Sequence, residues 1–205
     1  PGARFIYSDI NFILLGEIVR RLSGKNLPDF VREEVFLPLG MKDSMFRPRR
    51  ALRPRIAPTE IVDGQPLRGV VHDETTRYMD GVAGHAGLFT TADDLARFAE
   101  LMLGLGRRGR VRLFSPLTVA KFTTPQSPPD QPILRGLGWD IDSSYSGNRG
   151  ELFHLGSYGH TGFTGTSLWI DPRTETYVIL LANSVHPRRR PAITSLRGRV
   201  ATVVA

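Results

Sequence analysis

The residues of this chain best suited to chemistry are His160, Thr161 and Gly162, which stand among small residues ahead of a predicted strand. Glycine has no Cβ, so a ligand can approach the backbone closely there, and the N–H groups of an edge strand can bind a carbonyl oxygen. The stretch from Gly159 to Pro172 is therefore a candidate wall of an active site. A tight bend or bulge that carries a hydrogen-bonded histidine would give the same pattern.

Two further stretches combine residues of a similar kind. Tyr7, Ser8 and Asp9 precede an amphipathic helix, and a glycine-rich loop covers residues 81–89. A phenol beside a positive charge loses its proton more readily, so Tyr7 suits acid–base chemistry. A core tyrosine ahead of a helix is the alternative for Tyr7. In the loop, His85 is predicted to act as a bracing hydrogen-bond partner.

The composition indicates a folded domain. The 205 residues are 40% hydrophobic and 23% charged, which is enough to bury a core. No run of about eighteen apolar residues is present, so the sequence predicts no transmembrane segment. Cysteine is absent, which excludes disulfides and thiolate nucleophiles from this sequence. The stretch from Pro1 to Phe5 reads as a turn without an initiator methionine, so we expect a piece of a longer protein.

The net charge of +7 comes mainly from arginine. Basic clusters at 47–50, 107–110 and 188–190 stand in connections rich in Pro and Gly, without interleaved aromatic residues. A polyanion-binding surface is one interpretation of these clusters, and solvated loops are the other. The pattern favours solvated loops, and we expect no nucleic-acid partner.

Hydrophobic periodicity predicts helices in the first two thirds of the chain. Apolar residues recur at helical spacing from Asp9 to Leu22, with Asp9 as the cap and Gly24 after the end. Thr91 is the expected N-cap of a helix that runs to Gly104. Further helices are expected at 28–35, at 115–122 and at 192–205, and an irregular segment at 47–71.

Short β-rich segments bounded by turn residues occupy the last third, at 136–142, 151–156, 164–170 and 176–183. The last two are predicted to form a hairpin across residues 171–175. Helices followed by an antiparallel sheet indicate an α+β fold with helices packed on the sheet. We expect one domain over residues 1–205 whose N-terminal part is missing.

The three stretches occur in an order that resembles the serine β-lactamase-like superfamily, which includes class C β-lactamases, D-alanyl-D-alanine carboxypeptidases and related esterases. Residues 1–9, with the helix that follows and Pro38-Leu39-Gly40-Met41, are similar to the middle of that fold. The loop and its capped helix are similar to the family pattern G-G-L-F-S-T-A-x-D-L. His160-Thr161-Gly162 takes the place of the third motif, usually K-T-G. The resemblance implies a β-lactamase/transpeptidase-like fold and a penicillin-recognising serine hydrolase.

The family's chemistry needs a serine nucleophile with a lysine one helical turn later. No serine in this chain has a lysine three positions on, and no G-x-S-x-G elbow is present. Thr118 and Lys121 have that spacing, but they stand in the wrong place in the family order and read as one helix face. In the family, the S-x-x-K helix precedes the tyrosine motif. The resemblance therefore implies a nucleophile upstream of Pro1 and a chain that is inactive by itself.

The resemblance implies catalytic roles for Tyr7 and His160. Tyr7 would share the proton of the serine and deliver it to the leaving group, while His160 would orient Tyr7 or the substrate carboxylate. A histidine can be uncharged near neutral pH, which implies tolerance of uncharged ester substrates. Asp9 holds a substrate-binding position where the family usually has asparagine. Because an ionised carboxylate cannot donate a hydrogen bond, Asp9 is expected to serve there only as the helix cap.

Thr161, Gly162 and Phe163 are the other substrate-binding residues that the resemblance implies. Thr161 would hydrogen-bond a substrate carboxylate. The backbone N–H of Phe163 would supply half of an oxyanion hole, and the amide of the missing serine would supply the other half.

The remaining histidines are His72, His85, His154 and His186. Their spacing does not match H-E-x-x-H or a comparable ligand pattern, and no cysteine adds a ligand. We expect neither a metal site nor a cofactor.

The leading interpretation is acyl transfer on D-alanyl peptides, β-lactams or small esters, with a small molecule or a peptidoglycan peptide as substrate. The resemblance implies the bacterial cell envelope, periplasmic or extracellular. The alternative is a non-catalytic family member that binds peptidoglycan fragments or serves as a scaffold domain in a fusion protein.

Without the upstream helix, the apolar faces of the helices at Asp9 and Thr91 and one side of the sheet lose cover, so we expect self-association through exposed core.

Overall fold

The computed structural model describes residues 5–205, which form two compact units. Unit 1 comprises the described residues before Tyr7 together with 96–182 and 191–205. Unit 2 comprises residues 7–95 and 183–190. The turn predicted at the start of the chain falls on residues 1–4, outside the described residues.

Unit 1 is built on a five-stranded sheet with the order β11-β10-β9-β8-β7, so strands that follow one another in sequence lie side by side. All its pairings are antiparallel. The strands are β7 (Leu134–Arg135), β8 (Asp140–Asp142), β9 (Tyr158–Thr161), β10 (Thr166–Asp171) and β11 (Thr176–Leu181). A separate hairpin joins β5 (Arg107–Arg108) to β6 (Val111–Arg112). The antiparallel sheet and the α+β class predicted from the sequence are confirmed.

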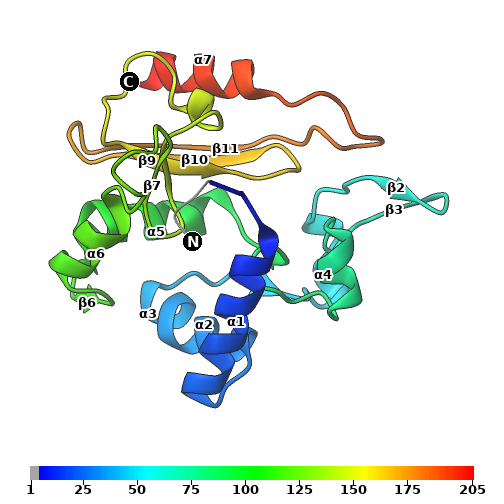
Figure 1. Cartoon of the computed structure of the whole chain (residues 1–205). Coiled ribbons are helices and arrows are strands. Elements are labelled where there is room, and N and C mark those ends of the chain that lie inside the picture. The colour runs from blue at the N-terminus through cyan, green and yellow to red at the C-terminus, as the bar shows by residue number, and fades with distance from the viewer. Residues whose placement is uncertain (1–4) are drawn as a thin grey trace. The chain divides into compact units, whose positions relative to one another are not determined.

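Helices cover both faces of this sheet, as Figure 1 shows. Helix α7 (Thr194–Val204) lies on one face, and α6 (Pro116–Thr123) lies on the other together with the part of α5 (Ala92–Leu103) that belongs to unit 1. Side chains alternate along a strand, so neighbours on β10 point to opposite faces. Ile170 packs in one cluster with Met102 and Val119, whereas Trp169 packs in another with Ala201.

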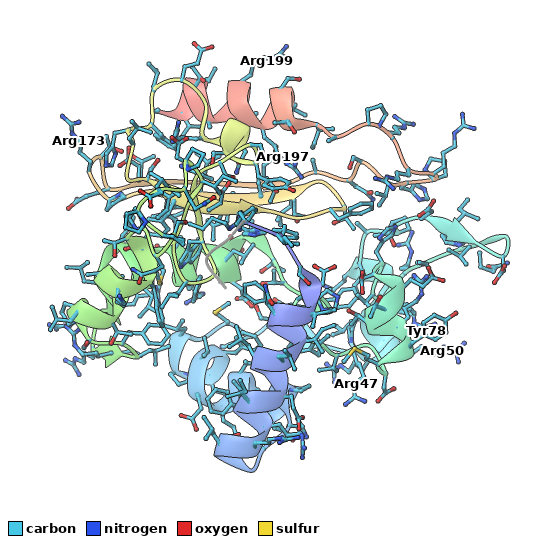
Figure 2. The ribbon with its side chains drawn as sticks, viewed as in Figure 1. Arg47, Arg50, Tyr78, Arg173, Arg197 and Arg199 are labelled. Carbon is cyan, nitrogen blue, oxygen red and sulfur yellow. The ribbon has the colours of Figure 1, made fainter. Side chains whose placement is uncertain are left out.

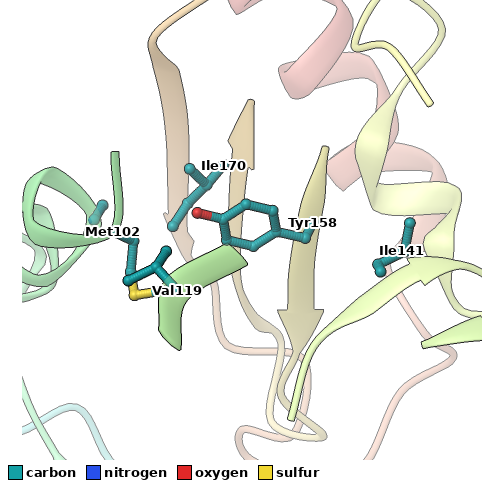
Figure 3. Close-up of a cluster of buried hydrophobic side chains, with 6 residues drawn as sticks. Met102, Val119, Ile141, Tyr158 and Ile170 are labelled. Carbon is teal, nitrogen blue, oxygen red and sulfur yellow. The ribbon is translucent and has the colours of Figure 1, made fainter. Parts of the chain in front are cut away.

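The larger of these clusters surrounds the ring of Tyr158 (Figure 3). Tyr158 is 2% exposed and packs with Met102, Val119, Ile141 and Ile170. Because burial disfavours the charged phenolate, the pKa of Tyr158 is raised well above its usual range. Tyr158 is therefore a core tyrosine.

Gly159 explains how the sheet accommodates the indole of Trp169, which lies opposite it in the β9–β10 ladder. A Cβ on Gly159 would lie 2.1 Å from Cε3 of Trp169 and 2.4 Å from the carbonyl oxygen of Leu168. Any side chain larger than hydrogen would displace the ring or the strand. This glycine is needed for packing.

The β10–β11 hairpin is confirmed, with Asp171 paired with Thr176 at its end. The strand predicted at 151–156 is wrong, because that segment forms turns and the strand begins only at Tyr158. Gly150 and Gly156 have φ values of 73° and 109°, which lie in the left-handed region and break an extended chain. The segment before Gly150 instead forms a 3₁₀ turn at Ser146–Arg149.

Unit 2 begins with α1 (Asp9–Ser23), followed by α2 (Leu27–Val31), a π-helical turn (Arg32–Phe36) and α3 (Leu37–Leu39). Gly24 and Gly40 end α1 and α3 with φ values of 70° and 71°. Glycine adopts this left-handed conformation without a Cβ penalty. The helix predicted at 28–35 is thus part of a longer helical run, with Asn26 as its cap.

The rest of unit 2 consists of short elements. A two-stranded pairing joins β1 (Met45–Phe46) to β4 (Leu88–Phe89), and a hairpin joins β2 (Ile61–Val62) to β3 (Gln65–Pro66). Helix α4 (Glu74–Tyr78) and a 3₁₀ helix (Arg50–Arg55) complete the unit. Within residues 47–71, which were expected to be irregular, the structure has the 3₁₀ helix and the β2–β3 hairpin. Strands of two residues are too short for alternation to reveal them.

Of the two N-caps predicted from the sequence, the one at Thr91 is confirmed and the one at Asp9 is wrong. Ser115 caps α6, since its Oγ accepts a hydrogen bond from the N–H of Thr118 at 3.1 Å. Thr91 caps α5 through the N–H of Asp94 at 3.3 Å. Asp9 does not cap α1, because the N-cap position belongs to Ser8 and Asp9 is already the first helical residue. Its carboxylate instead lies in the first turn, where the positive end of the helix dipole favours a negative charge.

We expected uncovered apolar surface on the helices at Asp9 and Thr91, and the structure shows it on α1 but not on α5. Helix α1 contains no buried residue, and its apolar ridge is exposed, with Ile10 63%, Leu14 55%, Ile18 48% and Leu22 84% accessible. Helix α5 is different, because its Leu101 and Met102 are buried. The prediction for the sheet is wrong as well, since α7 covers one face and α5 and α6 cover the other.

No helix within residues 5–205 combines the length and apolar character that a membrane span requires.

Candidate functional site

His160 and Thr161 are the last two residues of β9, and Gly162 opens the turn into β10. The sequence placed them at the start of a strand, whereas the structure places them at the end of one. The expectation of an edge strand is also wrong, because β9 lies between β10 and β8. The pairing with β8 is short, however, and joins Asp140 to Gly159.

Hydrogen bonds within the turn fix the backbone around Phe163. The N–H of Gly162 donates to the carbonyl of Thr166 at 2.7 Å, and the N–H of Gly165 donates to the carbonyl of Gly162 at 3.1 Å. A Cβ on Gly162 would lie 2.1 Å from Oγ1 of Thr166, so a larger residue would require the Thr166 side chain to rotate. The Phe163 side chain is 61% exposed at the tip of the turn.

Arg197 of α7 braces this turn from the helix side of the sheet. Its Nη2 donates to the carbonyls of Gly162 and Thr166, both at 2.9 Å. The residue is 6% exposed, and burial lowers the pKa of its guanidinium. Figure 2 shows Arg197 directed toward the sheet, whereas Arg199 of the same helix points away. The turn that follows the histidine motif is thus held by a buried cation.

His160 contacts a second arginine, Arg135 of β7. Nη2 of Arg135 lies 3.0 Å from Nε2 of His160, and Nδ1 of His160 lies 2.9 Å from the carbonyl oxygen of Thr161. Burial is the largest effect on the pKa of His160 and lowers it. The hydrogen bond to the Thr161 carbonyl and the charge of Asp140 raise the pKa, whereas the charge of Arg135 lowers it. The net effect favours an uncharged imidazole.

Asp140 of β8 connects this arginine to the sheet. Its Oδ1 lies 3.5 Å from Nη1 of Arg135, and the two side chains are 3% and 14% exposed. The hydroxyls of Ser143 and Ser146 donate to the Asp140 carboxylate at 2.7 Å and 2.9 Å. A buried carboxylate with several hydrogen-bond donors is well suited to hold a guanidinium in place.

Tyr7 and Asp9 belong to unit 2, whereas the histidine motif belongs to unit 1. Tyr7 is 47% exposed and lies two residues before α1. His160, Thr161, Gly162 and Phe163 are brought together on one strand end and its turn. The pairing of Tyr7 with His160 stays a prediction.

The glycine-rich loop packs against α1 within unit 2. A Cβ on Gly84 would lie 2.0 Å from the carbonyl oxygen of Phe12, and a Cβ on Gly16 would lie 3.3 Å from the N atom of Gly84. Nε2 of His85 lies 3.0 Å from Oδ1 of Asp73, which caps α4. The prediction that His85 braces the loop is confirmed.

An apolar hollow of about 470 Å³ lies between this loop and one side of α1. Its walls come from Phe12, Val19, Leu27 and Phe36, and His85 is its one titratable lining residue. Acyl transfer needs several polar groups that converge on the reacting carbonyl. The hollow by itself therefore lacks the groups for that chemistry.

The other histidines outside the motif each contact a separate partner. His72 pairs with Glu60 at 3.0 Å, His154 pairs with Asp171 at 2.6 Å, and Nδ1 of His186 lies 2.8 Å from the Thr59 carbonyl. Across residues 5–205, no three side chains of His, Asp or Glu gather in a geometry that could hold a metal ion.

Sequence reasoning missed Arg135, Asp140 and Arg197. Arginine makes up most of the basic residues of this chain, so no single one stands out. The sequence gives no signal for Asp140, because a carboxylate is usually solvated. Arg197 carries no signal either, since a cation on a terminal helix is usually solvated.

Comparison with known proteins agrees with this architecture. The family model described as Beta-lactamase matches residues 1–201. Proteins of Salmonella schwarzengrund and Salmonella paratyphi B, each named "Putative D-alanyl-D-alanine carboxypeptidase", are 38% and 37% identical over 204 aligned positions that include 91% of this chain. The match includes only 46% of each relative, so the chain spans about half the length of these curated relatives.

Solved structures show the same fold. A beta-lactamase from Mycobacterium bovis is 25% identical, with a TM-score of 0.70 over 100% of this chain and 64% of that one. The octameric penicillin-binding protein homologue from Pyrococcus abyssi superposes with a TM-score of 0.68 at 22% identity, over 99% of this chain and 43% of that one. Simvastatin synthase from Aspergillus terreus gives a TM-score of 0.69 at 21% identity, over 100% of this chain and 55% of that one.

Proposed function

The chain belongs to the beta-lactamase family, and we propose that it is part of a serine hydrolase that acts by acyl transfer on D-alanyl peptides, β-lactams or small esters. The observation that carries the proposal is the strand end formed by His160, Thr161 and Gly162, with the hydrogen-bonded turn that follows it and Arg197, which donates to that turn. The relatives named as D-alanyl-D-alanine carboxypeptidases favour a peptidoglycan peptide among the substrates.

In this proposal, the nucleophile is a serine of an S-x-x-K helix in the part of the protein that precedes Pro1. Its Oγ attacks the substrate carbonyl carbon, and the Oγ proton passes through Tyr7 to the leaving amine or alcohol. Water then releases the acyl group from the serine. The chain described here supplies the proton carrier and the strand along which the acyl substrate lies.

The turn between β9 and β10 supports the proposed role of the Phe163 N–H. An oxyanion donor must be held rigidly at the position where charge develops. The turn hydrogen bonds, at 2.7 Å and 3.1 Å, and the two bonds from Arg197 restrict the backbone on both sides of Phe163. In the proposed reaction the Thr161 hydroxyl receives the substrate carboxylate.

Asp9 has a smaller part in the proposal than the asparagine it replaces. As the first residue of α1, its carboxylate interacts favourably with the helix dipole, and it cannot donate to a substrate amide when ionised. This difference favours carboxypeptidase or esterase substrates over β-lactams. We place the protein in the bacterial cell envelope, where D-alanyl peptides occur.

The test is turnover by the full-length protein of a D-alanyl-D-alanine peptide and of a p-nitrophenyl ester. Tyr7→Phe removes the proton carrier, and we expect kcat to fall by about a hundredfold or more. Tyr145→Phe is the matched control, because Tyr145 is 47% exposed, as Tyr7 is; it is expected to keep wild-type turnover.

Equal activity of Tyr7→Phe and wild type would contradict the role of Tyr7. No turnover of either substrate class by the full-length protein would favour the second candidate, a non-catalytic member of the family that binds peptidoglycan fragments. A full-length sequence without an S-x-x-K motif would favour that candidate as well.

A further inference from the structure

The position of the proton on His160 follows from its two hydrogen-bond partners. A guanidinium carries five N–H donors and has no acceptor, so it can only donate to Nε2 of His160. Nε2 must then present its lone pair, and the ring proton must be on Nδ1. Nδ1–H has an acceptor in place, because the Thr161 carbonyl lies 2.9 Å away. The two contacts together specify one neutral tautomer.

Protonation of His160 would disrupt this arrangement. A proton on Nε2 would face a guanidinium nitrogen at 3.0 Å, so a hydrogen bond would be replaced by a contact between two cations. Leu168 is the residue opposite His160 on β10, so that strand adds no charge to offset the repulsion. Tyr158 lies two residues before it on β9 and stays protonated because it is buried. Asp140 is the nearby carboxylate, and it is already engaged with Arg135.

Arg135 is held strongly enough to impose this state. Asp140 contacts it at 3.5 Å, and the side chains of both residues are largely buried. The aromatic ring of Phe5 lies 5.9 Å from the guanidinium carbon, within the range of a cation–π contact. A guanidinium remains charged at every pH that a folded protein tolerates.

We propose that Arg135 is a positioning residue that holds His160 neutral with its proton on Nδ1, and that Arg135 provides the permanent positive charge at this strand end. His160 then acts as neither acid, base nor cation in the reaction, but as a rigid link between Arg135 and the Thr161 backbone. The role of Arg135 in catalysis rests on the proposed function, whereas the assignment of a neutral His160 does not depend on it. The charge that a lysine would carry in the strand motif comes instead from β7.

The first test is nitrogen NMR of the full-length protein labelled with ¹⁵N-histidine, with the His160 signals assigned by their loss in His160→Gln. At pH 7 we expect Nδ1 to be protonated and Nε2 to be an unprotonated, hydrogen-bonded nitrogen, with a titration midpoint below 6.5. A charged His160 at pH 7, or a proton on Nε2, would overturn the proposal. This measurement needs no variant of Arg135.

The second test replaces the arginine. Arg135→Gln is expected to move the His160 midpoint upward, because it removes the neighbouring positive charge, whereas Arg135→Lys keeps that charge and should leave the midpoint low. Arg149→Gln is the matched control, since Arg149 is 18% exposed in unit 1 and pairs with Asp142 at 3.4 Å. An unchanged midpoint in a folded Arg135→Gln protein would contradict the proposal.

Activity separates this inference from the proposed function. We expect Arg135→Gln to lose on the order of tenfold or more in kcat/KM toward the ester, because the strand end loses its fixed geometry, and Arg135→Lys to recover part of it. At pH values above the His160 midpoint, the profile of wild-type kcat/KM should show no ionisation that is lost in His160→Gln. An inactive wild-type protein whose His160 is neutral would refute the proposed function and leave the charge assignment intact.

Discussion

Replacing Arg197 by methionine tests how the turn after the histidine motif is held in place. Methionine keeps an unbranched apolar side chain of similar reach and removes the guanidinium. The two hydrogen bonds from Nη2 to the carbonyls of Gly162 and Thr166, both at 2.9 Å, are lost. Each carbonyl keeps one backbone donor, because Gly165 and Gly162 donate to them within the turn.

The magnitude follows from opposing contributions. Two hydrogen bonds from a charged group contribute about 3 to 6 kcal/mol together. Against this, Nε of Arg197 is buried and has no hydrogen-bond partner among the described residues, which costs about 1 to 3 kcal/mol that methionine would recover. We therefore expect Arg197→Met to lower the free energy of unfolding by about 2 to 3 kcal/mol.

The assay is urea denaturation of the full-length protein, with Arg199→Met as control. Arg199 lies on the same helix but is exposed and points away from the sheet (Figure 2). The control is expected to change the free energy of unfolding by less than about 0.5 kcal/mol. An Arg197→Met protein as stable as wild type, or more stable, would refute the reasoning, because burying the cation would then cost more than its hydrogen bonds return.

Two further predictions concern packing and pH. Gly84→Ala places a Cβ 2.0 Å from the carbonyl oxygen of Phe12, a backbone atom that cannot rotate away. We expect this variant to lower the free energy of unfolding, measured by urea denaturation, by about 3 kcal/mol. Unchanged stability would show that the loop does not lie on α1. Burial works to raise the pKa of Asp171, but the bonds from His154 and from backbone N–H groups outweigh it and lower the pKa below 3.8. The stabilisation from Asp171 should therefore be complete above pH 3.8 and be lost as pH falls further. We expect Asp171→Asn to lower the free energy of unfolding by about 3 kcal/mol at pH 7. Thermal unfolding of this variant should depend less on pH in the acid range than that of the wild type.

Elements with strong periodicity were predictable from the sequence. Helix α1 has apolar residues at helical spacing and a glycine after its end, and the hairpin of β10 and β11 has a β-rich segment on each side of a turn. The cap of α5 followed from Thr91, whose hydroxyl accepts the N–H of Asp94. These signals are local, so the rest of the chain does not alter them.

Strand β9 was missed for a physical reason. Its residues Tyr158 to Thr161 include Gly159, which has low strand propensity and is required only because the Trp169 ring lies over it. The covered face of α5 was missed for a similar reason, because the sheet that buries Met102 is formed by residues more than thirty positions further along the chain. Tertiary packing decided both cases.

The candidate site was predictable in its motif and not in its charges. The positions of His160, Thr161, Gly162 and Phe163 on one strand end follow from their being adjacent in sequence. The contact of His160 with Arg135 joins residues 25 positions apart through side chains of the sheet, and no spacing rule predicts it. The sequence suggested a histidine that responds to pH, whereas the structure surrounds it with groups that favour its neutral form.

The most direct test of the account is to label the full-length protein with a fluorescent penicillin and to map the adduct by mass spectrometry. We expect a covalent adduct on a serine outside residues 1–205, followed three positions later by lysine, with labelling slowed in Tyr7→Phe. An adduct on a serine of this chain, or a full-length protein that has no S-x-x-K motif and neither labels nor hydrolyses esters, would contradict it.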